Sequence, residues 1–254
     1  MNRQIYYHRV IDSTNDEAKR LIERGEPHGT LIVADEQTAG RGRSGRSWVT
    51  PPMSAIALSL ILRPAAPASP HLTQISLLGG LAVLEGIKRA TKLTPQLKWP
   101  NEVLINGSKV AGVLAESLFA GDRLEAVIVG MGVNVNAAPP PDLKLEYPAT
   151  CLADALGHHV DREELIEAIL ESFDARYSQL GTPSLTEAWA AHLAMKGQGV
   201  QVVGVNETTG GRLEGVTAEG ALLIRLESGE IKTILAGDVH LRAKDFRDKD
   251  FRSF

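Results

Sequence analysis

The stretch Val103-Leu104-Ile105-Asn106-Gly107-Ser108-Lys109-Val110-Ala111-Gly112-Val113 places an Asn-Gly pair between two runs of strand-forming residues. An Asn-Gly pair in this position is the strongest short-range signal for a β-hairpin with a type I′ turn. A further strand-like run covers residues 124–135, after a turn at Gly121-Asp122. Together these runs predict the antiparallel centre of a sheet.

Outward from this hairpin, apolar runs at 30–34 and 55–62 predict two more strands. Helices are predicted over residues 71–91, from 161 to about 173 and from about 184 to 195, where apolar residues recur at helical spacing. The first helix is predicted to begin at the capping box Thr14-Asn15-Asp16-Glu17 and to end at Gly25. These elements predict an α+β fold with a mixed or antiparallel sheet.

The composition of the chain changes at residue 199. Short β-rich pieces at 200–205, 211–216, 221–226 and 231–235 are separated by turns that contain glycine. This regular spacing predicts a small antiparallel barrel. We therefore divide the chain into a larger domain over residues 1–198, a barrel over 199–243 and a tail over 244–254, to which we assign no function.

Residues 40–48, Gly-Arg-Gly-Arg-Ser-Gly-Arg-Ser-Trp, form a loop between the predicted strands at 30–34 and 55–62. Arginine binds phosphate or carboxylate through a fixed fork of donors, and glycine lets the backbone come close to a ligand. The loop therefore predicts a site for a bound anion. A flexible loop, or an RNA-binding segment of the Arg-Gly kind, is the alternative interpretation. Gly130 and Gly132 predict a second place where a ligand or another backbone approaches closely.

The composition restricts the possible functions. The chain has 254 residues, a formal net charge of −4 and 43% hydrophobic residues, which argues against a general nucleic-acid-binding surface. Its single cysteine, Cys151, fits a reducing compartment. There is no signal-peptide pattern, and the longest apolar runs are well short of the roughly 20 residues that span a bilayer. We therefore expect a cytoplasmic protein without membrane contact, and no protein metal site is predicted, because no residues have metal-ligand spacing.

Five motifs occur in an order that resembles the biotin protein ligases. They are Ser13-Thr14-Asn15, Gln37-Thr38-Ala39 running into residues 40–48, Lys98-Trp99-Pro100-Asn101, Lys109-Val110-Ala111-Gly112 and Gly130-Met131-Gly132-Val133-Asn134. The resemblance covers the whole chain and implies a class II synthetase-like catalytic domain followed by a small SH3-like barrel. The first motif follows soon after the N-terminus, which resembles the monofunctional type without an N-terminal DNA-binding domain.

The resemblance implies an ATP-dependent reaction with Mg²⁺ as the companion of ATP. Biotin would be activated to biotinyl-5′-AMP and transferred to a lysine of a biotin carboxyl carrier protein domain, as in acetyl-CoA carboxylase or another biotin-dependent carboxylase. No nucleic-acid partner is implied, and the protein would be a monomer or a homodimer. The alternatives are a lipoate or octanoate protein ligase or transferase of related fold, and a non-catalytic RNA-binding module that uses the Arg-Gly loop.

The same resemblance implies roles for individual residues. Arg43 and Arg46 would clamp the phosphates and the intermediate, and Lys109 would bridge the biotin carboxyl group and the α-phosphate. Trp48 would cover adenine, whereas Trp99 is interpreted as structural. The implied ligand-binding positions are Ser13, Thr14, Asn15, Gln37, Gly40, Arg41, Gly42, Arg43, Trp48, Asn101, Lys109, Gly112, Gly132 and Asn134.

One residue departs from the family pattern. The family has Asp after the Lys-Trp-Pro-Asn motif, and this chain has Glu102, whose carboxylate reaches one methylene further. If that carboxylate orients or deprotonates the acceptor lysine, its geometry differs here. We include Glu102 with Lys109, Arg43 and Arg46 as candidate catalytic residues.

Overall fold

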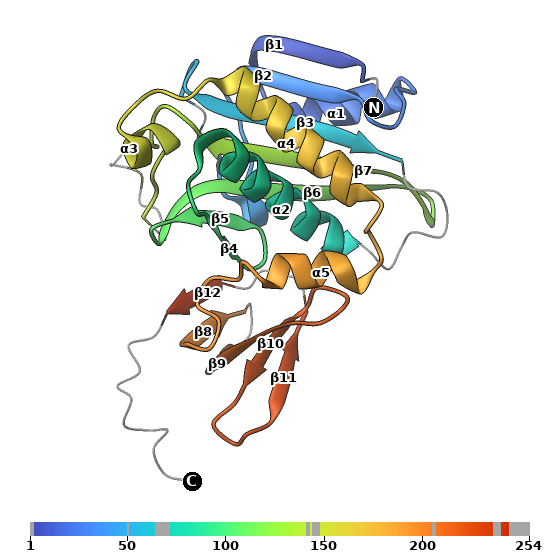
Figure 1. Ribbon diagram of the computed structural model, residues 1–254. Coiled ribbons are helices and arrows are strands. Elements are labelled where there is room, and N and C mark those ends of the chain that lie inside the picture. The colour runs from blue at the N-terminus through green and yellow to red at the C-terminus, as the bar shows by residue number, and fades with distance from the viewer. Residues whose placement is uncertain are drawn as a thin grey trace.

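Figure 1 shows the computed structural model, which describes residues 3–49, 51–63, 72–140, 143, 148–204, 207–235 and 240–243. Within these residues one large mixed sheet has the strand order β1-β2-β3-β7-β6-β5-β4. Its strands are β1 (Ile5–Ile11), β2 (Leu31–Gln37), β3 (Ala55–Leu62), β4 (Gln96–Lys98), β5 (Glu102–Ile105), β6 (Ser108–Ala120) and β7 (Arg123–Asn134).

The predicted hairpin is confirmed. Asn106 and Gly107 both have positive φ, 50° and 78°, as a type I′ turn requires, and β5 pairs antiparallel with β6. β6 in turn pairs antiparallel with β7, and β7 with β3. The sequence prediction missed β1, which pairs parallel with β2 at the edge of the sheet. Burial alternates along most of β1, but Ile5 and Tyr7 lie on its exposed side, so the sequence lacks the apolar alternation that predicts a half-buried strand.

Helices cover both faces of this sheet. The helices are α1 (Thr14–Glu23), α2 (Leu72–Thr91), α3 (Leu152–Leu156), α4 (Arg162–Tyr177) and α5 (Pro183–Ala190). α2 and α4 lie on one face, over the main hydrophobic core, and α1 lies on the opposite face with a smaller apolar cluster (Figure 1). The fold class predicted from the sequence is therefore confirmed.

Two helix predictions were wrong in detail. The residues of the predicted capping box start one position inside α1: Ser13 is the N-cap and makes no side-chain cap hydrogen bond, while the Thr14 hydroxyl contacts other side chains. α5 ends at Ala190, and not near residue 195, because the backbone beyond it pairs with β4 through Leu97 and Leu193. α3, a helix of five residues, was not predicted.

The C-terminal part is a separate antiparallel sheet with the order β11-β10-β9-β8-β12. Its strands are β8 (Gly199–Val203), β9 (Thr208–Val216), β10 (Leu222–Arg225), β11 (Ile231–Ile234) and β12 (His240–Ala243). The predicted small antiparallel domain is present. Among the residues described, its end strands β11 and β12 do not pair, so hydrogen bonding does not close the sheet into a ring. The predicted tail over 244–254 lies outside the described residues.

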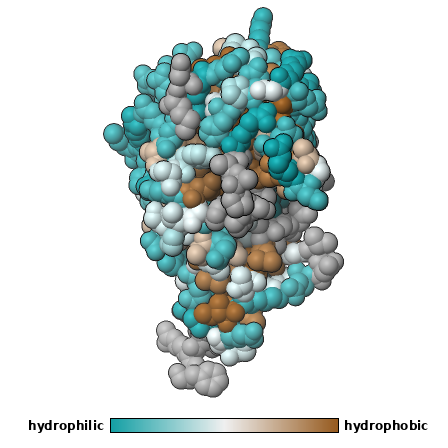
Figure 2. Space-filling view, turned by 90° about the vertical axis from the view of Figure 1, so that its right-hand side faces the viewer, coloured by the Kyte–Doolittle hydropathy of each residue, from teal (hydrophilic) through white to brown (hydrophobic). Residues whose placement is uncertain are grey.

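The small sheet contacts the larger domain through its β9–β10 turn. Trp99 is fully buried and its indole Nε1 donates to Gly220 O over 3.0 Å, which is consistent with the structural interpretation of this tryptophan. Gln74 of α2 donates to Ala218 O over 2.6 Å. Figure 2 shows a largely hydrophilic face with small hydrophobic patches on both parts. None of the helices described is long and apolar enough to cross a membrane.

Candidate active site

A cavity of about 360 Å³ opens on the α1 face of the sheet. Its floor is made of small residues that stand opposite one another on three neighbouring strands, because Ala57 pairs with Gly132 and Gly132 with Gly112. Further along β7 on the same face, Ala126 and Ile128 pack against α1. The cavity therefore lies where the side chains on this face become smaller along β7. Its volume is in the range of small-molecule sites.

All the sequence-predicted site residues except Gly40 line this cavity. They are Ser13, Thr14, Asn15, Gln37, Arg41, Gly42, Arg43, Arg46, Trp48, Asn101, Glu102, Lys109, Gly112, Gly132 and Asn134. They come from α1, the loop over 40–48 and strands on both sides of the sheet centre. The fold thus brings together motifs that are far apart in the sequence.

The two glycines of β7 allow close approach, but of side chains and not of the ligand or backbone that the sequence predicted. A Cβ on Gly130 would lie 2.3 Å from Asn15 Oδ1, and one on Gly132 would lie 2.4 Å from Trp48 Cε2. Both distances are far below van der Waals contact. The approaching groups are thus side chains of α1 and of the loop over 40–48.

One end of the cavity carries a Lys-Glu-Lys cluster. Glu102 accepts from Lys98 Nζ over 2.5 Å and from Lys109 Nζ over 2.6 Å. Lys98 and Glu102 are cross-strand partners on β4 and β5, and Glu102 pairs in turn with Gly112 on the cavity floor. Two lysines and one carboxylate have a net charge of +1. The cluster is thus suited to an anionic ligand.

The carboxylate of this cluster stays ionised well below neutral pH. Burial raises the pKa of Glu102, but attraction to Lys109 and Lys98 outweighs burial and lowers the pKa to about 2. A carboxylate with so low a pKa is a poor proton acceptor near neutral pH. The geometry favours a role in orienting lysine side chains over a role as a general base.

Lys109 is held in place by its backbone as well as by Glu102. Its N–H donates to Pro148 O over 2.8 Å, and its carbonyl accepts from Thr150 N over 2.9 Å. Its Nζ lies 5.6 Å from the centroid of the Trp48 ring, within range of a cation–π interaction. The ammonium group therefore sits between the carboxylate and the indole.

The loop over 40–48 folds back on itself. Gly42 N donates to Arg46 O over 2.7 Å, and Trp48 N donates to Gly40 O over 2.9 Å. A Cβ on Gly40 would lie 2.3 Å from Trp48 O, so the closing contact of the loop excludes a side chain at this position. Arg43 and Arg46 thereby come to the cavity from one short, tightly turned segment.

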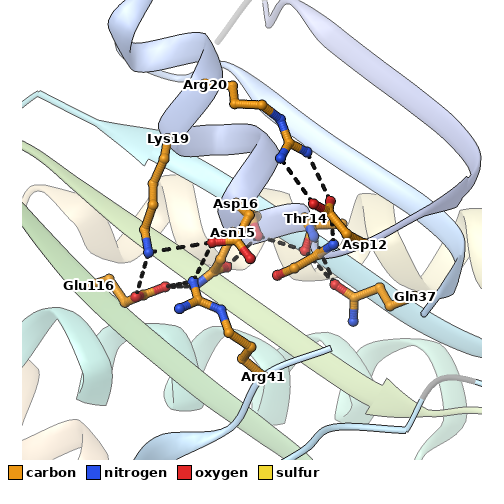
Figure 3. A network of polar contacts seen from close by, with 11 residues as sticks. Asp12, Thr14, Asn15, Asp16, Lys19, Arg20, Gln37, Arg41 and Glu116 are labelled. Carbon is orange, nitrogen blue, oxygen red and sulfur yellow. Dashed lines mark hydrogen bonds and ion pairs between the residues drawn. The ribbon is translucent and has the colours of Figure 1, made fainter. Parts of the chain in front are cut away.

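At the other end of the cavity a polar network joins α1 to β2 and β3 (Figure 3). Gln37 Oε1 accepts from Thr14 N over 2.8 Å and lies 3.1 Å from Thr14 Oγ1. Ser59 Oγ lies 2.8 Å from Thr14 Oγ1 and 2.6 Å from Asn15 Oδ1. Ser13, Thr14 and Asn15 are all buried, so the N-terminus of α1 presents fixed polar groups.

Two asparagines were predicted to contact ATP. Asn101 Nδ2 donates to Val113 O over 2.6 Å, and Asn134 Nδ2 donates to Thr150 O over 3.0 Å. Both amides therefore hold backbone in place. Asn134 Oδ1 and Trp48 Nε1 are buried and have no hydrogen-bond partner among the residues described. Such orphaned atoms at a cavity wall are typical of groups that bind a ligand.

Four polar residues at or near the cavity were not among the predicted site residues: Ser47, Lys98, Ser59 and Glu116. Lys98 lies within a motif, and only the cross-strand pair with Glu102 indicates its importance. Ser59 was detectable, because it is the one polar residue in the otherwise apolar run over 55–62. Glu116 gave no local signal, since its partners are on α1 and the loop.

In the part of the chain that the structure describes, no group of three His, Cys, Asp or Glu side chains is placed to hold a metal ion. Magnesium often keeps few protein ligands and binds through substrate phosphates. The site therefore fits a magnesium ion that is held mainly by a nucleotide.

Comparison with known proteins gives two family matches. Residues 7–134 match the Biotin/lipoate A/B protein ligase family, and residues 197–242 match the Biotin protein ligase C terminal domain. Among relatives, the chain is 39% identical to the bifunctional ligase/repressor BirA of Bacillus subtilis, over 95% of this chain and 75% of that protein. It is 36% identical to the biotin--[acetyl-CoA-carboxylase] ligase of Paracoccus denitrificans, over 86% of this chain and 92% of that one.

A solved structure is similar over nearly the whole chain. The biotin protein ligase of Aquifex aeolicus in complex with biotin and ATP has a TM-score of 0.83 and 32% identity, covering 95% of this chain and 99% of the Aquifex chain. The similarity therefore extends through both the larger domain and the small C-terminal sheet.

Proposed function

Because this chain belongs to the biotin/lipoate A/B protein ligase family, we propose that it is an ATP-dependent biotin protein ligase. It activates biotin to biotinyl-5′-AMP and transfers the biotinyl group to a lysine of a biotin carboxyl carrier protein domain. The observation that carries the proposal is a cavity between a positively charged Lys-Glu-Lys cluster and a buried polar network. An acid with an apolar tail and a polar ring matches this arrangement.

The polar network is the part of the cavity that suits the biotin ring. Ser13, Thr14 and Gln37 supply hydrogen-bonding groups at fixed positions, with the backbone of Gly40 and Arg41 nearby. A few aligned polar groups on an otherwise apolar wall fix the orientation of such a ligand. The carboxylate of biotin would then extend toward Lys109.

The loop and the glycine floor suit ATP. Arg43 and Arg46 would pair with phosphate oxygens, and Trp48 would cover the adenine base. Asn134 Oδ1 is an acceptor without a partner among the described residues, which matches an amino group such as that of adenine, and Asn101 lies on the same wall. Mg²⁺ bound to ATP would neutralise phosphate charge.

Lys109 is the group that makes the first half-reaction possible. An oxygen of the biotin carboxylate forms a bond to the α-phosphorus while the bond to the pyrophosphate oxygen breaks, so two anions must meet. Lys109 lies in a cluster of net charge +1, and its ammonium would stabilise charge on both groups. Lys98 also pairs with Glu102, so the two ammonium groups share one carboxylate charge. Glu102 therefore does not cancel the positive charge of Lys109.

In the second half-reaction an acceptor lysine attacks the carbonyl carbon of biotinyl-5′-AMP. AMP leaves with the bonding electron pair, and the amine loses its proton to solvent. The mixed anhydride would hydrolyse in open water, so it must stay covered until the carrier domain arrives. The loop over 40–48, closed by the hydrogen bond from Trp48 N to Gly40 O, would provide this cover.

The finer parts of the proposal concern organisation and partners. We infer a catalytic domain over residues 1–198, a C-terminal domain over 199–243 and a tail over 244–254 without an assigned role. The net charge of −4 supports a protein partner over a nucleic-acid partner. The need for ATP and the single buried cysteine support a cytoplasmic location.

Incubation with biotin, ATP, Mg²⁺ and a carrier domain tests the proposal by the intact mass of the carrier. We expect one biotinyl group per carrier, dependent on ATP and lost when the acceptor lysine is replaced by arginine. Lipoate and octanoate in place of biotin serve as the competing substrates. Preferential attachment of either one, or no modification of any carrier, would refute a biotin ligase.

A further inference from the structure

Arg41, in the loop over 40–48, pairs with two carboxylates from outside the loop. Its Nη2 donates to Glu116 Oε2 over 2.8 Å and lies 2.9 Å from Asp16 Oδ1. Asp16 belongs to α1 and Glu116 to β6, so one guanidinium group joins the loop to two other elements. Figure 3 shows the Arg41 side chain extending toward both carboxylates.

The two carboxylates are themselves held in place. Glu116 also accepts from Asn15 Nδ2 over 2.7 Å and from Lys19 Nζ over 3.0 Å, and the same Lys19 Nζ lies 3.5 Å from Asp16. Two cations and two carboxylates give this cluster a net charge of zero. It differs in this respect from the Lys-Glu-Lys cluster, whose net charge is +1. The carboxylates thus offset the charge of Arg41, so this cluster does not attract an anion as the Lys-Glu-Lys cluster does.

The contacts of Arg41 fasten the first arm of the loop. Just before the loop, Ala39 N donates to Asp12 O over 2.8 Å, in the segment that leads into α1. Two residues later, Arg41 adds a side-chain anchor to α1 and to β6. The first arm is therefore tied to the body of the domain by its backbone and by one guanidinium group.

The returning arm of the loop is fastened to this first arm. Trp48 N donates to Gly40 O over 2.9 Å, and Arg41 pairs with Ser47 in an isolated antiparallel bridge. Arg43 lies between the two arms and lines the cavity. Its position over the cavity therefore depends on an arm that Arg41 anchors.

We propose that Arg41 is a positioning residue that, with Asp16 and Glu116, latches the loop to α1 and β6 and so prolongs the retention of biotinyl-5′-AMP. The Arg41 side chain acts through the loop and is not a ligand of the phosphate. This inference rests on the proposed function, in which the loop covers that intermediate.

Two variants break the latch from opposite sides. The double variant Asp16→Asn with Glu116→Gln, here called the acid variant, raises the net charge by two, whereas Arg41→Gln lowers it by one. If charge alone acted, or if Arg41 bound the phosphate, the acid variant would hold the anionic adenylate more tightly and Arg41→Gln would hold it less tightly. A latch predicts faster dissociation of the adenylate in both variants.

A pulse-chase with labelled biotin measures the dissociation rate of biotinyl-5′-AMP. We expect about three- to tenfold faster dissociation in both variants, because partly exposed ion pairs contribute modestly. The control is Glu85→Gln with Glu171→Gln, which also removes two ion pairs and raises the net charge by two, but on α2 and α4, on the opposite face of the sheet. The control should keep the wild-type rate.

Trypsin cleavage after Arg43 and Arg46 in the ligand-free protein gives a second measurement. The acid variant leaves the sequence of the loop unchanged, so its cleavage rates compare directly with those of the wild type and the control. We expect faster cleavage in the acid variant than in both, at a melting temperature equal to that of the control. Unchanged cleavage, or unchanged or slower dissociation of the adenylate in the acid variant, would overturn the proposal.

A single substitution covers the case in which the acid variant does not fold. Asp16→Asn alone should still speed both dissociation and cleavage, and an unchanged or slower rate of either would overturn the latch. If the wild type forms no biotinyl-5′-AMP, the proposed function itself fails. That result is distinct, because the cleavage rates of the ligand-free variants still report on the latch.

Discussion

Lys109 Nζ donates to Glu102 Oε1 over 2.6 Å, so the ammonium group proposed to contact both substrates is tethered to the neighbouring strand. The same carboxylate accepts from Lys98. This sharing leaves the cluster with a net positive charge in a half-buried place, where electrostatic interactions are stronger than in water. The cluster is therefore already arranged for anions and needs little reorganisation during the reaction.

Lys109→Ala should lower the rate of biotinyl-5′-AMP formation by about 100-fold or more, because the site loses its cation between two anions. The rate of pyrophosphate release in the presence of biotin measures this step. Lys232→Ala is the control, since Lys232 pairs with Glu207 on the C-terminal sheet, away from the cavity. A Lys109→Ala protein that forms the adenylate at the parental rate would show that Lys109 is not this cation.

Glu102 should make the folded state sensitive to acid. Its folded-state pKa of about 2 is below the ordinary 4.5, so the unfolded chain binds the proton more tightly. The stabilisation is present above pH 4.5 and disappears as the pH falls toward 2, with a total of about 3 kcal/mol. Urea unfolding of the wild type and Glu102→Gln at pH values from 7 to 3 measures this contribution to the free energy of unfolding.

In this comparison the free energy of unfolding of the wild type should fall more steeply below pH 4.5 than that of Glu102→Gln. Parallel curves for the two proteins would show that Lys98 and Lys109 do not stabilise the ionised form of Glu102. Glu102→Asp provides the further comparison, because it restores the residue of the family pattern with a side chain one methylene shorter.

Arg43→Ala should release biotinyl-5′-AMP about 10- to 100-fold faster, because a lost charge-assisted hydrogen bond costs roughly 1.5–3 kcal/mol. A pulse-chase with labelled biotin measures the dissociation rate. Arg43→Lys keeps the charge but loses the planar fork of donors. Its dissociation rate for biotinyl-5′-AMP should therefore lie between those of the wild type and Arg43→Ala. An unchanged dissociation rate in Arg43→Ala would contradict a phosphate clamp.

The parts of the fold that could be predicted are those with a local cause. The turn at Asn106 and Gly107, the apolar strand over 55–62 and the amphipathic helix over 71–91 follow from residues close together in the chain. β1 could not be predicted in this way. Its residues are partly exposed, and its parallel partner β2 lies beyond α1.

The candidate site also has a part that the sequence could predict and a part that it could not. Motif resemblance indicated the residues that line the cavity, but it could not indicate how they are held. Glu116 and Asn15 are separated by 101 positions, and only the pairing of β6 with β7 and the packing of α1 bring them together. The capping box failed for a related reason, because Thr14 has partners on β2 and β3 that a local pattern does not contain.

Gly132→Ala should weaken the binding of ATP by about tenfold or more and change the binding of biotin alone much less. A methyl group at residue 132 would lie 2.4 Å from Trp48 Cε2 and 2.6 Å from its Nε1, so the indole must leave its place above the cavity floor. The proposed biotin contacts at Thr14 and Gln37 are on the other side of the cavity.

Gly215→Ala is the matched control, because a Cβ there meets nothing within 4 Å and the substitution is also in a strand. Calorimetric titration with biotin and then with ATP separates the two effects. Equal loss of both affinities would indicate a general disturbance of the sheet, and no loss of ATP affinity would show that Trp48 does not cover the nucleotide.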